Sequence, residues 1–91
     1  MSVTIAGTEF DCVEYDARGD VLYLSVGEPR EPTRTLATTE GHAVDYGSDG
    51  SVIGMVLLNV RWTLERDGAL TVTLPEHPAV ADSRELAAAL G

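Results

Sequence analysis

Three carboxylates stand close together near the start of the sequence, Glu14, Asp16 and Asp20. Carboxylate oxygens are ligands that calcium accepts, so a cation held by these residues is one interpretation. Like charges that face each other across two strands are unfavourable without such a counter-ion. In the alternative, Asp16 accepts backbone N–H groups in a turn and Asp20 faces solvent. Turn chemistry favours this alternative, because no spacing of the EF-hand kind accompanies the acids.

Asp45 is a candidate for a general base or a ligand-binding carboxylate. It is expected on one face of a sheet with Ala43, Ile53 and Met55, an apolar setting that functional carboxylates often occupy. Hydration near a sheet edge, or pairing with an arginine, is the alternative. His42 precedes Asp45 by three positions, and residues three apart on a strand point to opposite faces, which argues against a His-Asp pair. An enzyme, a metal-binding protein or a small-ligand protein that uses Asp45 or the first three carboxylates is therefore the second interpretation of function.

The remaining reactive side chains form no motif of a known catalytic or metal-binding kind. His42, His77 and Cys12 lack the local spacing of zinc ligands, and the sequence has no Gly-x-Ser-x-Gly element and no phosphate-binding loop. Cys12 is expected on a strand as an inert packing residue. The sequence therefore predicts no catalytic residue and no cofactor.

Composition limits the class of protein. The chain has 91 residues, enough for one small domain, and 15 acidic residues against 6 basic ones give a net charge of −9. Such a surface repels phosphate backbones, which argues against a nucleic-acid partner. One cysteine cannot form an internal disulfide, and no apolar stretch approaches the roughly 20 residues of a membrane span. We therefore expect a soluble, cytoplasmic protein with no membrane partner.

Antiparallel strands are expected to position the candidate residues. Alternating apolar residues predict a short strand over 3–6, a hairpin of 10–16 with 20–26, a weak strand over 33–38 and a central hairpin over 42–60. A three-residue loop over 17–19 would place Asp16 opposite Asp20. A loop over 48–50 would place Tyr46 opposite Val52 and Val44 opposite Gly54. The bare Gly54 would then leave room beside Val44 or for something packed above the sheet.

The last third of the chain predicts another hairpin and a helix. A three-residue loop over 66–68 within 59–74 would pair Trp62 with Val72 and gather the apolar residues on one face. Residues 75–81 are expected to be a linker, because two prolines oppose regular structure there. A helix over 82–90 follows, with Asp82 as its cap and Glu85 completing a capping box. The sequence thus predicts an α+β fold, mainly an antiparallel sheet over 1–74 with a short C-terminal helix.

Two of the predicted strands are apolar on both faces, and one short helix cannot cover both. Leaving a large apolar side chain in water forgoes about 1.5 to 3 kcal/mol, a sizeable part of a small domain's stability. We therefore predict a non-enzymatic interaction module that forms a homodimer. Its expected contacts are Ile53, Met55, Leu57 and Trp62, tryptophan being common at interfaces. The negative charge adds a basic protein as a further expected partner.

Several short motifs occur in the order typical of one bacterial family. They are Tyr15-Asp16, Asp20, Leu22-Tyr23, Glu40-Gly41, Asp45-Tyr46, Asp49-Gly50, Val52 and Gly54. Over 13–58 the chain resembles the domain of unknown function 2283, and 59–74 is similar to the continuation found in a longer branch. Gly47 departs from the usual pattern, in which an acid stands at this position. The resemblance implies a small α+β domain, and an antitoxin-like role, since some relatives are encoded beside small toxin-like proteins.

Overall fold

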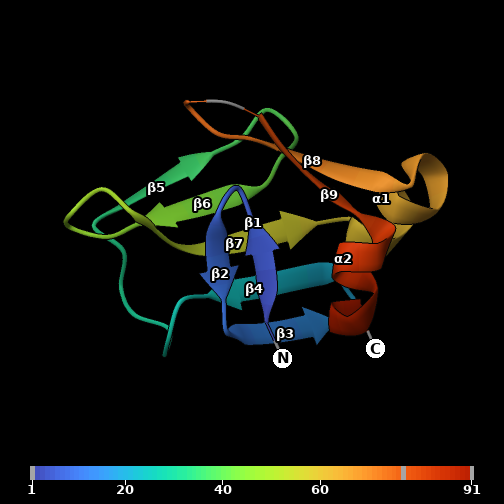
Figure 1. Cartoon of the computed structure of the whole chain (residues 1–91), viewed down its shortest axis with the longest axis horizontal. Helices are drawn as coiled ribbons and strands as arrows, with labels where there is room; N and C mark the ends of the chain where they lie inside the picture. The colour runs from blue at the N-terminus through green and yellow to red at the C-terminus, as the bar shows by residue number, and fades with distance from the viewer. Residues whose placement is uncertain (1, 77, 91) are drawn as a thin grey trace.

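The computed structural model describes residues 2–76 and 78–90, and its centre is a five-stranded sheet (Figure 1). Every neighbouring pair of strands in this sheet is antiparallel. In spatial order the strands are β3 (Cys12–Asp16), β4 (Val21–Ser25), β7 (Val52–Leu58), β6 (Ala43–Tyr46) and β5 (Arg34–Ala37). The α+β fold with a mainly antiparallel sheet is confirmed.

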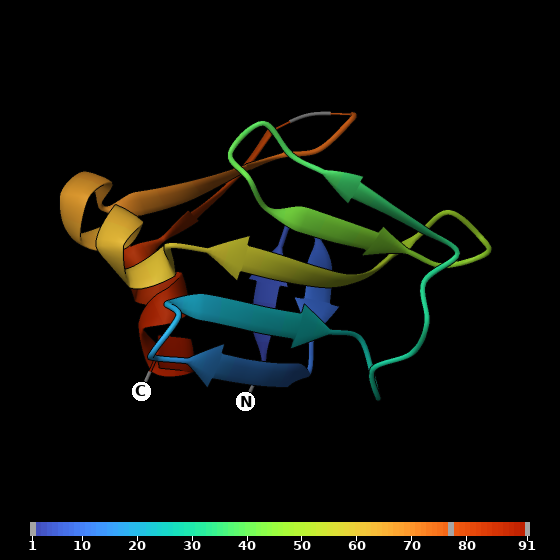
Figure 2. The ribbon, with the colours of Figure 1, turned by 180° about the vertical axis from the view of Figure 1, so that it is seen from behind.

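The other elements gather on one face of this sheet. Figure 1 views that face, and Figure 2 shows the opposite face, on which none of them lies. They are the hairpin of β1 (Val3–Ile5) with β2 (Thr8–Phe10), the hairpin of β8 (Ala69–Thr73) with β9 (Pro78–Asp82), and the helices α1 (Val60–Asp67), α2 (Ser83–Ala87) and η1 (Ala88–Leu90). We call the covered side the inner face and the other side the outer face.

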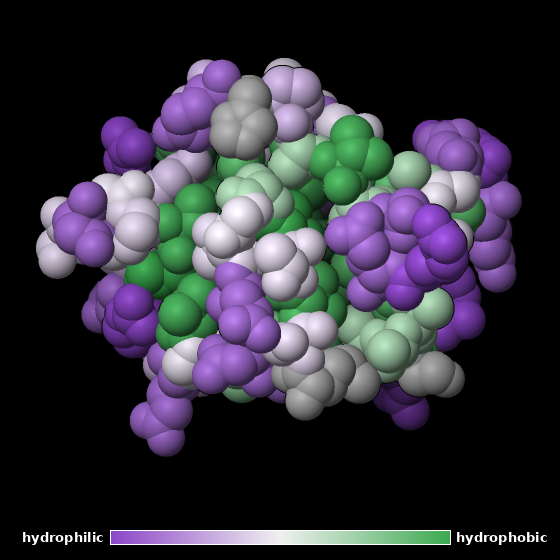
Figure 3. All heavy atoms as spheres, in the orientation of Figure 1, coloured by the Kyte–Doolittle hydropathy of each residue, from purple (hydrophilic) through white to green (hydrophobic). Residues whose placement is uncertain are grey.

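The core lies between the inner face and these elements. Its most deeply buried large side chains include Phe10 from β2, Leu22 from β4, Leu70 from β8 and Leu86 from α2. Hydrophobic residues are still visible over β6 and β7 from this side (Figure 3). Two hairpins and the helices thus cover most of the inner face, more than one terminal helix could.

The first hairpin has a longer connection than predicted. Asp16 pairs with Val21 rather than with Asp20, so four residues rather than three connect β3 and β4. Asp20 adopts the left-handed conformation with φ of 56°. An aspartate tolerates this region better than most residues, because its short polar side chain forms local hydrogen bonds.

The central hairpin starts in the predicted register and then shifts. Tyr46 pairs with Val52 as expected, but Asp45 pairs with Gly54 and Val44 with Met55. The shift lies at a β-bulge, where one extra residue of β7 has no partner on β6. The predicted pairing of Val44 with Gly54 is therefore wrong.

The predicted third hairpin is wrong in its first half, because Val60–Asp67 is the helix α1. Val60 and Leu64, four residues apart, point into the core, whereas Trp62 is 57% exposed. Gly68 ends the helix in the left-handed conformation, with its N–H bonded to Leu64 O. Trp62 therefore does not pair with Val72.

The predicted linker contains a strand. Residues 78–82 form β9, which pairs with β8 along its whole length. Pro78 stands at the first position of the strand, where a missing N–H is tolerated. The expectation for His77 lies outside the described residues.

The C-terminal helix is confirmed. Asp82 accepts the Glu85 N–H, and Glu85 accepts the Asp82 N–H, which is the predicted capping box. The helix continues as α2 and then as the 3₁₀ turn η1, up to Leu90. Neither these helices nor α1 is long and apolar enough to cross a bilayer, as far as the described residues show.

Candidate functional site

The outer face of the sheet carries a neutral strip of side chains. The cross-strand pairs of β4 and β7 place Val21 beside Leu58 and Tyr23 beside Val56. Tyr23 is 45% exposed and Leu58 38% exposed. We call these four residues the outer strip. They are the solvent-facing halves of the two strands that the sequence predicted to be apolar on both sides.

Carboxylates flank the outer strip. Glu14 of β3 pairs with Tyr23 and Asp16 of β3 pairs with Val21, so both acids lie along one side. On the other side, Asp45 of β6 lies beyond Gly54. The outer face is thus apolar along its middle and acidic at its margins.

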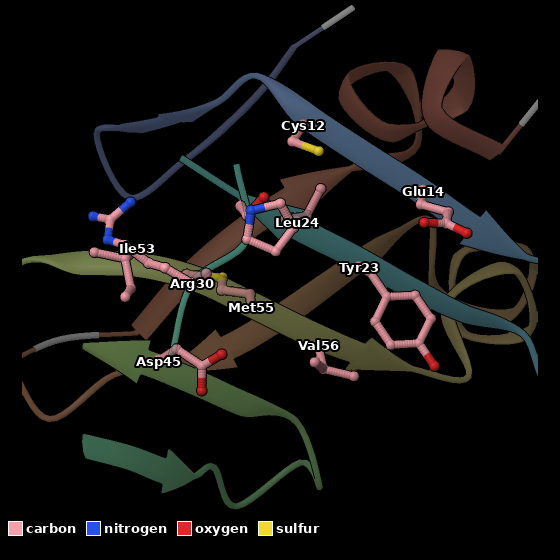
Figure 4. Close-up of a pocket in the computed structure, with 12 residues that line it drawn as sticks. Cys12, Glu14, Tyr23, Leu24, Arg30, Asp45, Ile53, Met55 and Val56 are labelled. Atoms are coloured by element: carbon pink, nitrogen blue, oxygen red, sulfur yellow. The ribbon is translucent and has the colours of Figure 1, made fainter. Parts of the chain in front are cut away.

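A groove of about 250 Å³ adjoins the outer strip (Figure 4). Figure 4 shows Tyr23 and Val56 toward one end of it and Arg30, from the loop between β4 and β5, toward the other; Pro29 of the same loop also lines it. Its other lining residues are Cys12, Glu14, Leu24, Ser25, Asp45, Ile53, Gly54 and Met55. Both apolar and polar side chains therefore line the groove.

Gly54 keeps the floor of the groove open. A Cβ atom at this position would lie 3.0 Å from Leu24 O and 3.5 Å from Asp45 Oδ2. Any larger residue would therefore crowd the neighbouring strand and occupy the space in front of Asp45. Gly54 was expected to leave room either beside Val44 or for something packed above the sheet, and the space lies above the sheet, beside Asp45.

Three predicted interface residues on β7 differ in their surroundings, because the bulge lies among them. Met55 and Leu57 are buried in the main core. Ile53 is also buried, at 6% exposed, but it lies outside that core cluster and lines the groove near Arg30, with its Cγ2 atom close to Gly47. Because the chain itself covers Met55 and Leu57, these two side chains are not available to a partner.

Asp45 has one engaged oxygen and one that faces the groove. Its Oδ1 atom accepts a hydrogen bond of 2.7 Å from Thr35 Oγ1 on β5. Its Oδ2 atom is the one near the position of the absent Gly54 side chain. Asp45 thus presents a fixed carboxylate to the groove.

His42 lies on the inner side and does not approach Asp45 as a catalytic partner would. It is buried, and its Nδ1 atom accepts the Leu58 N–H at 3.0 Å. Burial lowers the pKa of His42 from its usual value, although the nearby Glu40 works in the opposite direction. His42 is therefore a buried histidine with a structural hydrogen bond, and the spacing of His42 and Asp45 had argued against a pair between them.

The three carboxylates of the first hairpin do not converge. Asp16 accepts the Arg18 N–H at 3.1 Å within the turn, and Glu14 points to the outer face. The cation interpretation would need them together, and no group of three His, Cys, Asp or Glu side chains suited to a metal occurs in residues 2–76 and 78–90.

Asp20 has a structural role that the sequence analysis missed. Its carboxylate accepts hydrogen bonds from the N–H groups of Arg61 and Trp62, at 2.8 and 3.0 Å, and from Tyr15 Oη at 2.7 Å. Partial burial raises its pKa, but these hydrogen bonds outweigh that effect and lower the pKa. Asp20 therefore satisfies the free N–H groups at the start of α1.

Two further residues differ from their expected roles. Cys12 is exposed and lines the groove, because it lies on the outer side of the edge strand β3. Trp62 projects from α1, where the Arg66 guanidinium lies 4.3 Å from the centre of its ring. Of the predicted interface residues, Trp62 is thus at the surface, away from the groove.

Arg30, Pro29 and Ser25 are groove residues that no sequence motif indicated. They lie at or near the loop between β4 and β5, whose position relative to the sheet depends on tertiary structure. Arg30 Nη1 donates to Val26 O at 3.0 Å, which holds this side chain at the end of the groove. The turn-forming prolines are the signal that could have suggested a rigid wall there.

The fold and the groove define a small α+β protein whose central sheet has one largely covered face and one open face. The sequence profile of the family described as Protein of unknown function (DUF2283) matches residues 13–61, more than half of the chain. The protein therefore belongs to the DUF2283 family, as the resemblance implied. The matched segment contains all five strands of the central sheet apart from Cys12. Comparison with curated proteins and with solved structures finds no match.

Proposed function

We propose that this protein is a non-enzymatic interaction module that binds a basic protein partner with its outer face. The observation that carries the proposal is the outer strip, which remains in water although the rest of the chain covers the inner face. The exposed thiol of Cys12 at the same face suits a reducing compartment, and we place the activity in the cytoplasm.

Burial of the outer strip supplies the apolar part of the binding energy. Full burial of a large apolar side chain is worth about 1.5 to 3 kcal/mol, and Tyr23 and Leu58 are each more than one third exposed. A partner that covers both gains roughly 1 kcal/mol from each. Such a contribution is useful within an interface but too small to specify a partner by itself.

Charge selects the kind of partner. Glu14, Asp16 and Asp45 flank the outer strip, and the whole chain carries a net charge of −9. A basic surface complements this arrangement, which speeds encounter and disfavours acidic competitors. An antitoxin-like role, as the family resemblance implies, would be one instance in which the basic partner is a small toxin-like protein.

A second copy of the chain is the other occupant that the outer strip allows. Two copies that meet face to face would bury both strips and so form the homodimer predicted from the sequence. They would also bring two sets of flanking carboxylates together, which like-charge repulsion opposes. This is why a basic partner is the proposal and the homodimer is an alternative outcome of the test.

The test uses a synthetic peptide of alternating leucine and arginine, titrated into the ¹⁵N-labelled full chain. We expect amide shifts on β4 and β7, and a binding constant that weakens as salt rises. Tyr23→Ser should weaken binding by about fivefold, the equivalent of about 1 kcal/mol. Val80→Ser is the matched control, because Val80 is 62% exposed on β9, away from the outer face.

Two results would overturn the proposal. In the first, shifts map away from β4 and β7, or Tyr23→Ser and Val80→Ser have equal effects. In the second, sedimentation shows a dimer at micromolar concentration that becomes tighter at high salt and excludes the peptide. That salt dependence would identify a second copy as the occupant, because screening relieves repulsion between two acidic faces.

A further inference from the structure

We infer that the groove above Gly54 is a subsite for a cationic side chain, preferably arginine, supplied by the basic partner. This inference deepens the proposed function and rests on it. It assigns to Asp45 the role of the recognition carboxylate and to Gly54 the role of providing space.

One oxygen of the Asp45 carboxylate is engaged and the other faces the groove. Thr35 holds Oδ1 by a hydrogen bond of 2.7 Å, so the group has a fixed orientation before any partner arrives. Oδ2 faces the space above Gly54, where the structure shows no hydrogen bond to it from a described residue. A carboxylate oriented in this way loses little side-chain entropy when it accepts a further donor.

Gly54 has no side chain, and its two neighbours across the sheet are Ser25 on β4 and Asp45 on β6. Ser25 Oγ donates its own proton to Gly27 O at 3.0 Å, so its lone pairs remain able to accept. The open floor is thus bordered by two acceptors, which is the arrangement that a donor-only cationic group requires.

Apolar side chains connect the outer strip to the floor of the groove. Tyr23 and Val56 belong both to the groove and to the outer strip. A partner residue seated over the strip can lay its aliphatic stem along these two side chains and place its charge near Asp45. The subsite is therefore continuous with the docking face rather than separate from it.

The walls favour arginine over lysine. Ile53 lies beside Arg30 in Figure 4, and Pro29 also lines the groove. A guanidinium is more weakly hydrated than an ammonium and tolerates apolar walls better, and it offers several donors in one plane. Two acceptors on opposite sides of Gly54 suit such a planar group.

Arg30 places a positive charge, the same sign as the proposed ligand, at the end of the groove. Its guanidinium donates to Val26 O and lies turned away from Asp45 in Figure 4. A cation that enters the groove is therefore repelled by Arg30 while Asp45 attracts it. Removal of the Arg30 charge should strengthen binding, a direction opposite to the one expected if the groove held an anion.

The experiment titrates N-acetyl-arginine methylamide into the ¹⁵N-labelled full chain and follows the Gly54 amide. The matched control probe is N-acetyl-citrulline methylamide, which has nearly the same shape and no charge. We expect saturable millimolar binding of the arginine probe and at least fivefold weaker binding of the citrulline probe. Equal affinities for the two probes, or shifts that do not saturate, would overturn the inference.

The variants test each group separately. Asp45→Asn should weaken the arginine probe by about fivefold to tenfold, and Arg30→Gln should strengthen it by about twofold. Asp49→Asn is the control, because Asp49 is an exposed carboxylate bonded to Ser51 in the hairpin turn. If Asp45→Asn matches Asp49→Asn, or if Arg30→Gln weakens binding, the assignment is wrong. Gly54→Ala should abolish binding, and a folded spectrum is required before that result counts.

The two proposals can fail separately. If the leucine-arginine peptide binds the outer face and Asp45→Asn has no effect on it, the docking face stands and the subsite falls. If the arginine probe saturates at Gly54 but the peptide does not bind, the subsite stands as a site for a cationic side chain and the proposed docking function falls.

Discussion

Asp20 links the first hairpin to helix α1, and its replacement gives the sharpest test of the fold. The carboxylate accepts hydrogen bonds from the N–H groups of Arg61 and Trp62, which lie 41 and 42 positions later in the sequence. It also accepts one from the Tyr15 hydroxyl. Loss of a helix cap costs about 0.5 to 2 kcal/mol, and a further hydrogen bond about 1 kcal/mol. Asp20→Gly should therefore reduce the free energy of unfolding by about 2 kcal/mol.

Two companion substitutions separate the carboxylate from the backbone. Asp20 has a φ of 56°, which glycine adopts without strain and alanine does not. Asp20→Ala should therefore cost about 1 kcal/mol more than Asp20→Gly. Asp20→Asn keeps an acceptor oxygen and tolerates the left-handed region, so its cost should be about 1 kcal/mol.

Urea unfolding provides the measurement, followed by circular dichroism and by the fluorescence of Trp62 on α1. With a slope of about 1 kcal/mol per M, a loss of 2 kcal/mol moves the midpoint by roughly 2 M. Asp16→Ala is the control in the same loop, since Asp16 bonds to the turn alone and should cost about 0.5 kcal/mol. An Asp20→Gly protein within 0.5 kcal/mol of the parent, or an equal loss for Asp16→Ala, would refute the capping role.

Three more predictions concern single groups. The Tyr46 hydroxyl is buried and has no hydrogen-bond partner among the described residues, so Tyr46→Phe should raise the free energy of unfolding by about 1 kcal/mol in thermal or urea unfolding; a loss would reveal a partner. Burial works against ionisation of Glu40, but hydrogen bonds from the Thr73 hydroxyl and N–H lower its pKa from 4.5 to about 2. The stability that the ionised Glu40 contributes is present above pH 4.5 and lost as the pH falls to about 2. Glu40→Gln should therefore make the urea midpoint depend less on pH over that range. A midpoint that falls with pH as steeply as in the parent protein would contradict this. Burial lowers the pKa of His42 below 6.5, so its ring protons should titrate below that pH by NMR and stability should decline as the pH falls beneath 6.5; a titration at or above 6.5 would contradict the buried neutral form.

Local signals in the sequence were enough for the terminal helix and for the strands of the family segment. The capping box of Asp82 and Glu85 involves residues three apart, so both partners are visible in one short stretch. The strands β4 and β7 are recognisable because each is a short apolar run that follows a glycine-containing turn. The chemistry of such elements lies within a few residues of the elements themselves.

Helix α1 was mistaken for a strand because its determinants are remote. Val60, Trp62 and Leu64 alternate as in a strand, and the Gly68 turn pairs them well with β8 in a hairpin. The spacing of four between Val60 and Leu64 is equally a helical signal, and Gly68 is equally a helix end. What decides between the two is Asp20, which satisfies the first helix N–H groups from a distant hairpin and cannot be seen in a local pattern.

The candidate site exists because the pairing of β6 with β7 differs by one residue from the predicted register. In the predicted pairing Gly54 would lie opposite Val44, and the space it leaves would be beside Val44 or open to something packed above the sheet. The bulge at Ile53 shifts the pairing so that Gly54 lies opposite Asp45 on the outer face. The missing side chain therefore opens a groove in front of a carboxylate rather than a space beside Val44. A bulge of this kind re-aims side chains without changing the strand order, so Asp45 and Gly54 could each be singled out from the sequence while their pairing could not.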